Sequence, residues 1–203
     1  MPERGLQELA ALLQDISSSA PTPGGGSVAA IVGALAASLG AMAASIRASK
    51  TSDNRIQSLA KRFFDHQAAF LRLSADDEAA FEEVMAAFQL SNSDEAKSST
   101  RERALLRAAE VPLALAARCC DLLDDLAQMV SLATTHSVSD VGAAAHLARA
   151  AAESTLLNVE INAHMMQDEA ARGGVRRKKR ELELQCAEQT QTIVESVEAR
   201  IQG

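Results

Sequence analysis

The sequence predicts an all-α fold: a helical bundle of about six helices with a long buried helix at its centre. Proline occurs only at positions 2, 21, 23 and 112, and glycine is absent from 41 to 141. Long stretches rich in Ala, Leu, Glu and Arg therefore run without a helix breaker. No segment shows the sustained alternation of apolar and polar residues that predicts a β-strand. The chain has 203 residues, and 47% of them are hydrophobic. This length and composition suit a single domain over residues 1–203 with a full core.

The first two expected helices differ in composition. Residues 6–16 predict a short amphipathic helix with acids among its leucines. Residues 27–48 predict a second helix in which the larger side chains recur at spacings of four and three. Small residues, from Gly33 to Ala44, repeat on a neighbouring face. Two faces of this helix therefore need contacts, one of them very close, which places it in the middle of a bundle or at a subunit interface.

Residues 28–46 also raise the alternative of a membrane span. Nineteen residues without a charge approach the length that crosses a bilayer. Most of them are Ala, Gly and Ser, however, and these residues gain little free energy on transfer into lipid. We therefore favour a buried central helix.

Short motifs mark the ends of the third and fourth helices. Residues 53–90 predict a long third helix, and a polar loop follows it. Ser99-x-x-Glu102 has the residues of a capping box, in which both side chains satisfy free N–H groups at a helix start. We expect the fourth helix to cover residues 100–132, with a kink at Pro112.

Similar signals divide the C-terminal part of the chain. Ser137-x-x-Asp140 resembles a capping box and predicts that the fifth helix starts near residue 140. Residues 172–174 (Arg-Gly-Gly) are typical of a helix C-cap, so the fifth helix should end at residue 171. The last helix would then cover residues 175–201.

The third helix carries the clearest candidate for chemistry. Its apolar stripe is interrupted by His66, Ser74 and Asp77, while the other nearby acids project away from it. A buried carboxylate without a partner costs several kcal/mol or has a raised pKa. Asp77 is therefore either paired for structure or kept for chemistry, and the pattern leaves both open. His66 is about 16 Å from Asp77 along a helix, too far for a direct pair, and is expected to be a core or interface histidine.

The expected fifth helix presents two amides inward. Ser154, Asn158 and Asn162 recur at intervals of four, roughly opposite a charged face that we expect to be solvated. Inward amides in an Ala-rich helix need partners. Hydrogen bonds to other helices and hydrogen bonds to a polar heterocyclic ligand are equally compatible with this spacing.

Charge and cysteine content narrow the class of protein. The net charge of −7 and the pI near 5.1 argue against nucleic-acid binding as the main role. The basic run at residues 176–180 is expected to be a solvated helix face, with attraction of a polyanionic substrate tail as the alternative. Cys119, Cys120 and Cys186 show no metal-ligand spacing and are expected to be reduced core thiols of a cytoplasmic protein. Glu160 and His164 do not complete a metal-binding set, so we expect no metal.

The stretch Pro21-Thr22-Pro23-Gly24-Gly25-Gly26-Ser27 leads into the second helix. We expect the glycines to permit a tight turn and Ser27 to be the N-cap. A Walker phosphate loop is excluded, because no Lys-Ser/Thr pair follows the glycines. What remains is a bare backbone at a helix N-terminus that a flat or anionic ligand can approach closely.

Several of these motifs occur together in one order along the chain. They are residues 19–27 (Ser-Ala-Pro-Thr-Pro-Gly-Gly-Gly-Ser), 75–77 (Ala-Asp-Asp) with Ala80-Phe81, 111–113 (Val-Pro-Leu), 139–142 (Ser-Asp-Val-Gly), and Asn158-Val159 with Asn162. In this order and spacing the chain resembles the formimidoyltetrahydrofolate cyclodeaminase and methenyltetrahydrofolate cyclohydrolase family. The resemblance covers essentially the whole chain.

The resemblance implies an all-helical homodimer that binds folate in a groove at or near the dimer interface, without membrane or nucleic acid. The reacting carbon lies between N5 and N10 of tetrahydrofolate. In cyclodeaminases N10 attacks the N5-formimino carbon and ammonia leaves, whereas in cyclohydrolases water attacks the methenyl carbon. The tetrahydrofolate derivative is the substrate, and no permanently bound cofactor or metal is implied. A carboxylate can stabilise the cationic amidinium and carry the proton.

Roles for individual residues follow from the resemblance, position by position. Asp77 is the candidate acid/base or cation-stabilising carboxylate, with Asp140 and Lys50 as further catalytic candidates. Lys50 would meet the glutamate tail or the leaving group. The candidate substrate-binding residues are Pro23, Gly24, Gly25, Gly26, Ser27, His136, Asn158 and Asn162.

The chain departs from the family at two stretches. Relatives usually carry Gly-Asn-x-Asn before the Ser-Asp pair, whereas residues 133–138 here are Ala-Thr-Thr-His-Ser-Val. The lysine cluster after the second helix is also reduced to Lys50. His136 is either a polar substitute with a pKa near neutrality or a loop histidine without a function. The alternative function is therefore a non-catalytic folate-binding or helical interaction module that has lost the asparagine motif.

Overall fold

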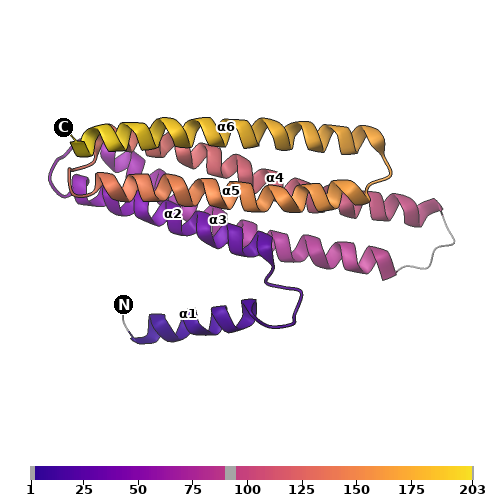
Figure 1. Cartoon of the computed structure of the whole chain (residues 1–203). Helices are drawn as coiled ribbons and strands as arrows, with labels where there is room; N and C mark the ends of the chain where they lie inside the picture. The colour runs from indigo at the N-terminus through magenta and orange to yellow at the C-terminus, as the bar shows by residue number, and fades with distance from the viewer. Residues whose placement is uncertain (1–2, 90–94, 203) are drawn as a thin grey trace.

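The computed structural model describes residues 3–89 and 95–202, and in α4 it describes side chains from Ser98 onward. The helices are α1 (Glu3–Ile16), α2 (Gly25–Ala48), α3 (Asn54–Gln89), α4 (Glu95–Leu132), α5 (Val138–Met165) and α6 (Glu169–Gln202). Helices α2 to α6 form one elongated bundle, and α1 stands beside it at the end of a linker (Figure 1). The predicted all-α class with six helices is confirmed for the described residues.

Helix α2 packs against α3, α4 and α5 through its small residues. Ala37 and Ala44, for example, are fully buried. Of the larger residues, Leu35 is 54% and Met42 40% exposed, whereas Val32 and Leu39 are partly buried against the core. Helix α2 is therefore a central helix of the bundle whose small-residue face is covered within the chain, while part of its larger-residue face is left open.

Glycines on α2 allow α3 to approach it closely. A Cβ atom added at Gly33 would lie 2.7 Å from the ring of Phe70, and one at Gly40 would lie 2.7 Å from the ring of Phe63. A Cβ atom added at Gly26 would overlap the carboxylate of Asp77. Gly26 lies seven residues before Gly33 on α2, and Asp77 lies seven residues after Phe70 on α3, so this pair continues the same row of contacts. Asp77 thus takes the place of a core aromatic residue at one end of the α2–α3 contact.

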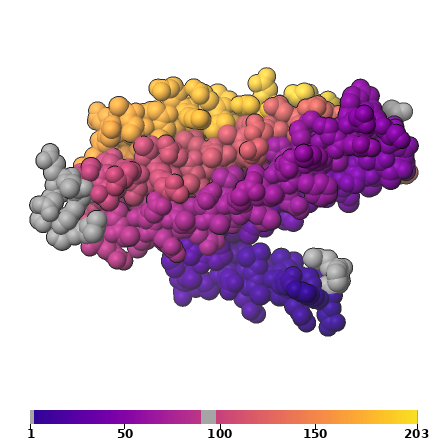
Figure 2. All heavy atoms as spheres, turned by 180° about the vertical axis from the view of Figure 1, so that it is seen from behind, coloured from indigo at the N-terminus to yellow at the C-terminus, as the bar shows by residue number. Residues whose placement is uncertain are grey.

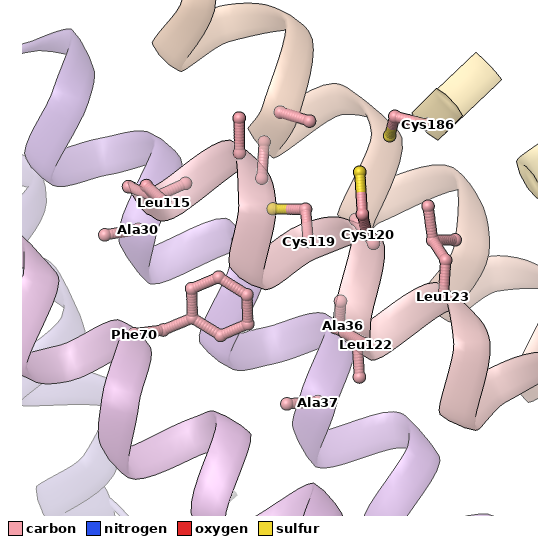
Figure 3. Packing of buried hydrophobic residues seen from close by; sticks show 14 of the residues in the cluster. Ala30, Ala36, Ala37, Phe70, Leu115, Cys119, Cys120, Leu122, Leu123 and Cys186 are labelled. Atoms are coloured by element: carbon pink, nitrogen blue, oxygen red, sulfur yellow. The ribbon is translucent and has the colours of Figure 1, made fainter. Parts of the chain in front are cut away.

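The rest of the core is built from alanines and leucines of α2, α4 and α5. Figure 3 shows Phe70 of α3 and Leu115 of α4 beside the alanines of α2. Cys119, Cys120 and Cys186 are free and buried, as predicted for core thiols. Because aromatic residues are scarce, the core is filled by close packing of small side chains.

Helix α4 begins earlier than predicted. It starts at Glu95, so Ser99 and Glu102 lie inside the helix and the predicted capping box at its start is wrong. The carboxylate of Glu102 instead accepts hydrogen bonds from the backbone N–H groups of Gln167 at 2.7 Å and Asp168 at 3.3 Å. It therefore holds the connection between α5 and α6. The helix continues through Pro112.

The boundary between α5 and α6 also differs from the prediction. Helix α5 ends at Met165, and Gly173 and Gly174 lie inside α6, so the predicted C-cap at residues 172–174 is wrong. The carboxylate of Asp168 accepts hydrogen bonds from the N–H groups of Ala170 at 2.9 Å and Ala171 at 3.0 Å. Asp168 thus caps the N-terminus of α6 and stabilises the start of the helix. This stabilisation exceeds the free-energy cost of placing two glycines inside the helix.

By length and composition alone, α2 is one helix in the described part of the chain that could cross a membrane. Of its most apolar 18-residue window, 56% is buried inside the bundle. The core helix of a bundle also has this combination of length and apolar composition, and the burial of α2 is the feature expected of such a helix.

Candidate functional site

A cavity of about 490 Å³ opens at the N-terminal end of α2. Its walls are the linker before α2, the first turn of α2, the second half of α3, and the last two turns of α5. Ala108 of α4 also lines it. The lining is mainly apolar with a few polar groups, and the volume is in the range of pockets for organic ligands with several rings.

Asp77 is half-buried at the α2 end of this cavity. The Ser27 hydroxyl donates a hydrogen bond to Asp77 Oδ2 at 3.2 Å, and the Ser27 N–H also stabilises the carboxylate. Burial raises the pKa of Asp77, and the two hydrogen bonds from Ser27 offset only part of that effect. The predicted inward position of Asp77 is thus confirmed, and a carboxyl group of this kind is suited to proton transfer.

Ser27 is not the N-cap that the sequence predicts. Helix α2 begins at Gly25, and Gly24 occupies the N-cap without a side-chain hydrogen bond. Ser27 lies in the first turn, fully buried behind Asp77 and off the cavity wall. The carboxylate of Asp77, from α3, therefore takes the place of a cap at the N-terminus of α2, where the helix dipole favours negative charge.

Space, and not backbone conformation, explains the glycines at this helix start. None of the described glycines has a positive φ, so the expected tight turn is not what requires them. Gly26 leaves room for the Asp77 carboxylate, whereas a Cβ at Gly25 would meet nothing within 4 Å. Gly24, Gly25 and Gly26 line the cavity. Pro23 does not line it, although its neighbours Pro21 and Thr22 do.

Asn162 connects the cavity to the proline of α4. Pro112 has no N–H, so the carbonyl of Ala108, four residues earlier, lacks its usual partner in the helix. Asn162 Nδ2 donates a hydrogen bond to that carbonyl at 2.8 Å. This bond fixes the amide of Asn162, a residue that also lines the cavity. Asn158, one turn earlier, also lines the cavity, and the two predicted inward amides therefore share one site.

Large apolar side chains that the residue-level prediction left out complete the cavity. Phe81, Met85 and Phe88 of α3 line it, together with Ile161 and Met165 of α5. All five are substantially exposed. The sequence carried a signal for two of them, because Phe81 and Phe88 lie on the same apolar stripe of α3 as Asp77.

Lys50, His136 and Asp140 lie at the other end of the bundle. Lys50 follows the C-terminus of α2, about 35 Å along the helix from Ser27. His136 is exposed in the turn between α4 and α5, and Asp140 lies in the first turn of α5, where its charge suits the helix dipole. Within one chain, the structure does not bring these three residues together with Asp77.

His66 and the first residue of the basic run, Arg176, have structural partners away from the cavity. Buried His66 contacts Asp125 of α4, with 3.1 Å between His66 Nε2 and Asp125 Oδ2. Arg62 donates to the same carboxylate at 3.0 Å. In the basic run, Arg176 pairs with Glu160 of α5 at 2.6 Å, and none of residues 176–180 lines the cavity.

Comparison with known proteins assigns the chain to a family. The family model described as formiminotransferase-cyclodeaminase matches residues 8–181. The chain belongs to this family. A methenyltetrahydrofolate cyclohydrolase of Methylorubrum extorquens is 33% identical over 82% of this chain and 84% of its own length. The crystal structure of formiminotetrahydrofolate cyclodeaminase from Thermotoga maritima matches with a TM-score of 0.84 and 27% identity over 96% of both chains.

The match to the formiminotransferase-cyclodeaminase family confirms the resemblance inferred from the motifs. It spans the glycine-rich start of α2, Asp77, Pro112, Asn158 and Asn162, which are the parts that form or support the cavity. In the described part of the chain, no three His, Cys, Asp or Glu side chains lie close enough together to hold a metal ion.

Proposed function

We propose that this member of the formiminotransferase-cyclodeaminase family is a one-carbon folate enzyme that hydrolyses 5,10-methenyltetrahydrofolate. The observation that carries the proposal is the half-buried Asp77 carboxyl in an apolar cavity, beside the bare backbone of Gly24 to Gly26. The choice of hydrolysis rests on the Methylorubrum relative, whose printed name is methenyltetrahydrofolate cyclohydrolase.

Asp77 can carry two of the proton transfers of this reaction. The methenyl carbon is part of a cationic amidinium, which the Asp77 carboxylate stabilises. Water attacks that carbon, a C–O bond forms, and the proton of the water passes to Asp77. The bond from this carbon to N5 then breaks while Asp77 returns the proton to N5. The remaining hydroxyl proton is released to solvent, and the carbon stays on N10 as a formyl group.

The other cavity residues suit the rest of the folate. Phe81 and Phe88 offer ring faces and edges to a flat pterin. The oriented oxygen of Asn162 accepts a hydrogen bond from a pterin N–H, and Asn158 adds a second amide. The backbone of Gly25 allows close approach, since no side chain separates it from the cavity.

Cyclodeamination is the second candidate, favoured by the fold match to the Thermotoga cyclodeaminase. In that reaction N10 attacks the formimino carbon and ammonia leaves, and the same carboxyl group would protonate the departing nitrogen. A non-catalytic folate-binding module would instead bind the substrate without turnover.

The methenyl chromophore distinguishes these functions. With purified protein, loss of the chromophore from methenyltetrahydrofolate indicates hydrolysis. Its appearance from the 5-formimino substrate, together with ammonia, indicates cyclodeamination. Tight folate binding without either change would contradict both enzymatic proposals.

Asp77→Asn tests the assignment of the carboxyl group. We expect kcat to fall by about 10²-fold or more, which is typical for loss of an acid/base group. Because burial disfavours the charged form of Asp77, the unfolding midpoint should stay unchanged or rise. Asp76→Asn, at the neighbouring exposed carboxylate, is the matched control and should retain activity. Full activity of Asp77→Asn would sink the assignment.

We further propose that the protein acts as a cytoplasmic homodimer, with residues 1–203 as one domain and with no membrane or nucleic-acid partner. The acidic charge and the free, buried cysteines support this setting. Folate enters as the substrate, with no permanently bound cofactor.

A further inference from the structure

A proline interrupts the hydrogen-bonding pattern inside α4. Pro112 is buried and lies near the middle of this helix, which continues on both sides of it. Figure 1 shows α5 in front of α4, and Figure 2, seen from behind, shows the outer face of α4 as a pink band between α3 and α6. Proline is the least favourable residue in a helix interior, so Pro112 does not serve the stability of α4 itself.

The proline leaves the carbonyl of Ala108 without its usual helical partner. In an α-helix this carbonyl accepts a hydrogen bond from the N–H of residue 112, which proline lacks. Ala108 is only 8% exposed, and a buried carbonyl without a hydrogen bond is unfavourable. Asn162 of α5 supplies the bond, with 2.8 Å between its Nδ2 and the Ala108 oxygen. A side chain at the cavity thus replaces the missing bond of the helix.

This bond also determines the orientation of the Asn162 amide. A backbone carbonyl can only accept hydrogen bonds, so the amide must present its nitrogen to Ala108, and its oxygen then points away from that carbonyl. Among the described residues, no protein donor contacts this oxygen. Ala108 and Asn162 both line the cavity. The wall of the cavity therefore carries a hydrogen-bond acceptor whose position is set from α4.

The end of α5 that carries Asn162 is held to α4 by other bonds as well. The Glu102 carboxylate accepts hydrogen bonds from the N–H groups of Gln167 at 2.7 Å and Asp168 at 3.3 Å, just after α5 ends. These bonds do not depend on the Ala108 carbonyl. Loss of the bond between Ala108 and Asn162 would therefore release a side chain, while α5 would keep its position.

Asn158 lines the same cavity but is not held in this way. It lies one turn before Asn162 on the same face of α5. Among the described residues, its amide has no hydrogen-bond partner. Of the two amides, one is fixed and the other is free to rotate. A fixed acceptor loses less conformational freedom when a ligand binds, so the bond from Asn162 favours binding more strongly.

We propose that Pro112 is a positioning residue for folate: by freeing the Ala108 carbonyl, it fixes the Asn162 oxygen as an acceptor for an N–H group of the pterin. Pro112 does not line the cavity, so it acts only through Ala108 and Asn162. The amino group and the ring N–H of a pterin are donors that suit such an acceptor. This inference rests on the proposed folate function.

The donor edge of the pterin is remote from the carbon between N5 and N10. A hydrogen bond at this edge is therefore made equally in the bound substrate and in the transition state. Its loss should raise KM and leave kcat nearly unchanged. A residue that supported only the fold would change stability without this selective effect on KM.

The side-chain amide of Asn162 reports the positioning in the absence of any folate. Its ¹⁵N–¹H NMR signals are assigned by their loss in Asn162→Asp. In Pro112→Ala, residue 112 regains an N–H and the ring no longer crowds the Ala108 carbonyl, so this carbonyl returns to the helical pattern. The Asn162 amide protons should then shift towards the values of a free amide and exchange faster with water. Unchanged Asn162 signals would overturn the proposal.

Binding of tetrahydrofolate measures the consequence for the ligand. This compound carries the pterin but no carbon between N5 and N10, so it binds without turnover. In Pro112→Ala its Kd should rise about fivefold, as for loss of one hydrogen bond, and KM for the methenyl substrate should rise with it. Val111→Ala is the matched control, because it removes volume packed against the core and leaves the hydrogen bonds of the helix intact. It should lower stability and leave Kd unchanged; an equal rise of Kd in both variants would overturn the proposal.

A double-mutant cycle tests whether Pro112 acts through Asn162. In an Asn162→Ala background, Pro112→Ala should have no further effect on Kd, because the amide that it positions is already absent. In an Asn158→Ala background the fivefold effect should persist. Effects that multiplied in the first pair would overturn the route through Asn162. If the wild type neither bound tetrahydrofolate nor turned over the methenyl substrate, the proposed function would fail, while the NMR signals would still decide whether Pro112 positions Asn162.

Discussion

At the scale of single residues, the charge on Asp77 depends on Ser27. Two hydrogen bonds from Ser27 favour the carboxylate, while burial opposes it and prevails. Ser27→Ala removes the hydroxyl donor and should raise the pKa of Asp77 further. If the carboxylate is the form that accepts the proton from water, the acid limb of the kcat/KM profile should move to higher pH.

A neighbouring serine provides the control for this measurement. The Ser74 hydroxyl donates to the backbone carbonyl of Ser27 at 3.4 Å and not to Asp77. Ser74→Ala should therefore leave the pH profile where it is. A Ser27→Ala profile that coincides with the wild type would show that this hydrogen bond does not tune Asp77.

Asp77 was predictable from the sequence, whereas its surroundings were not. A carboxylate on the apolar stripe of a long helix already indicates an inward group. That Ser27 would hold it, and that Pro112 would free a carbonyl for Asn162, depends on which turns of different helices lie side by side. The spacing of residues along one helix does not contain this information.

At the scale of helices, the glycines of α2 set the distance to α3. Gly33→Ala would place a methyl group 2.7 Å from the Phe70 ring, and both residues are buried. Overpacking of this kind costs about 1–3 kcal/mol, and the helix propensity of Ala returns less than 1 kcal/mol of that. We expect the free energy of unfolding, measured with urea, to fall by about 1–2 kcal/mol.

Gly173 of α6 is the matched control for the same substitution. A Cβ there would meet nothing within 4 Å, and the residue is exposed inside a helix. Gly173→Ala should therefore raise the free energy of unfolding by up to about 1 kcal/mol. Equal effects at the two glycines would contradict the close contact between α2 and α3.

Helix ends show where local signals are sufficient. The start of α3 and the ends of α1 and α2 were predicted within a residue or so, because polar and helix-breaking residues cluster there. The double glycine of α6 misled the prediction, since the decisive contacts at that boundary come from Asp168 and from Glu102 on a different helix. Short motifs indicate ends correctly only where no distant side chain supplies the missing hydrogen bonds.

At the scale of the whole molecule, the sequence identified surfaces but not their positions. The spacing in α2 correctly indicated one face for small residues and another for larger ones. It did not show that the chain leaves part of the second face exposed, or that α1 stands apart. The distance between Lys50 and Asp77 was also hidden, because it follows from the length of α2 as one unbroken helix.

Acid stability of the whole bundle should depend on Asp125, which joins α4 to α3. Burial raises the pKa of Asp125, but hydrogen bonds from His66 and Arg62 outweigh it, so the pKa lies below the ordinary value. A lowered pKa contributes stability above the unfolded value, near 4, and that contribution is lost as pH falls through the folded pKa. Asp125→Asn should therefore lower the free energy of unfolding by about 2 kcal/mol at pH 7, a moderate loss because Arg62 is partly exposed. The difference from wild type should shrink below about pH 4. Asp124→Asn, at the exposed neighbouring residue, is the control and should lower the free energy of unfolding by less. Urea unfolding across a range of pH measures both variants. A difference for Asp125→Asn that stayed constant down to pH 2 would contradict the electrostatic origin of the stabilisation.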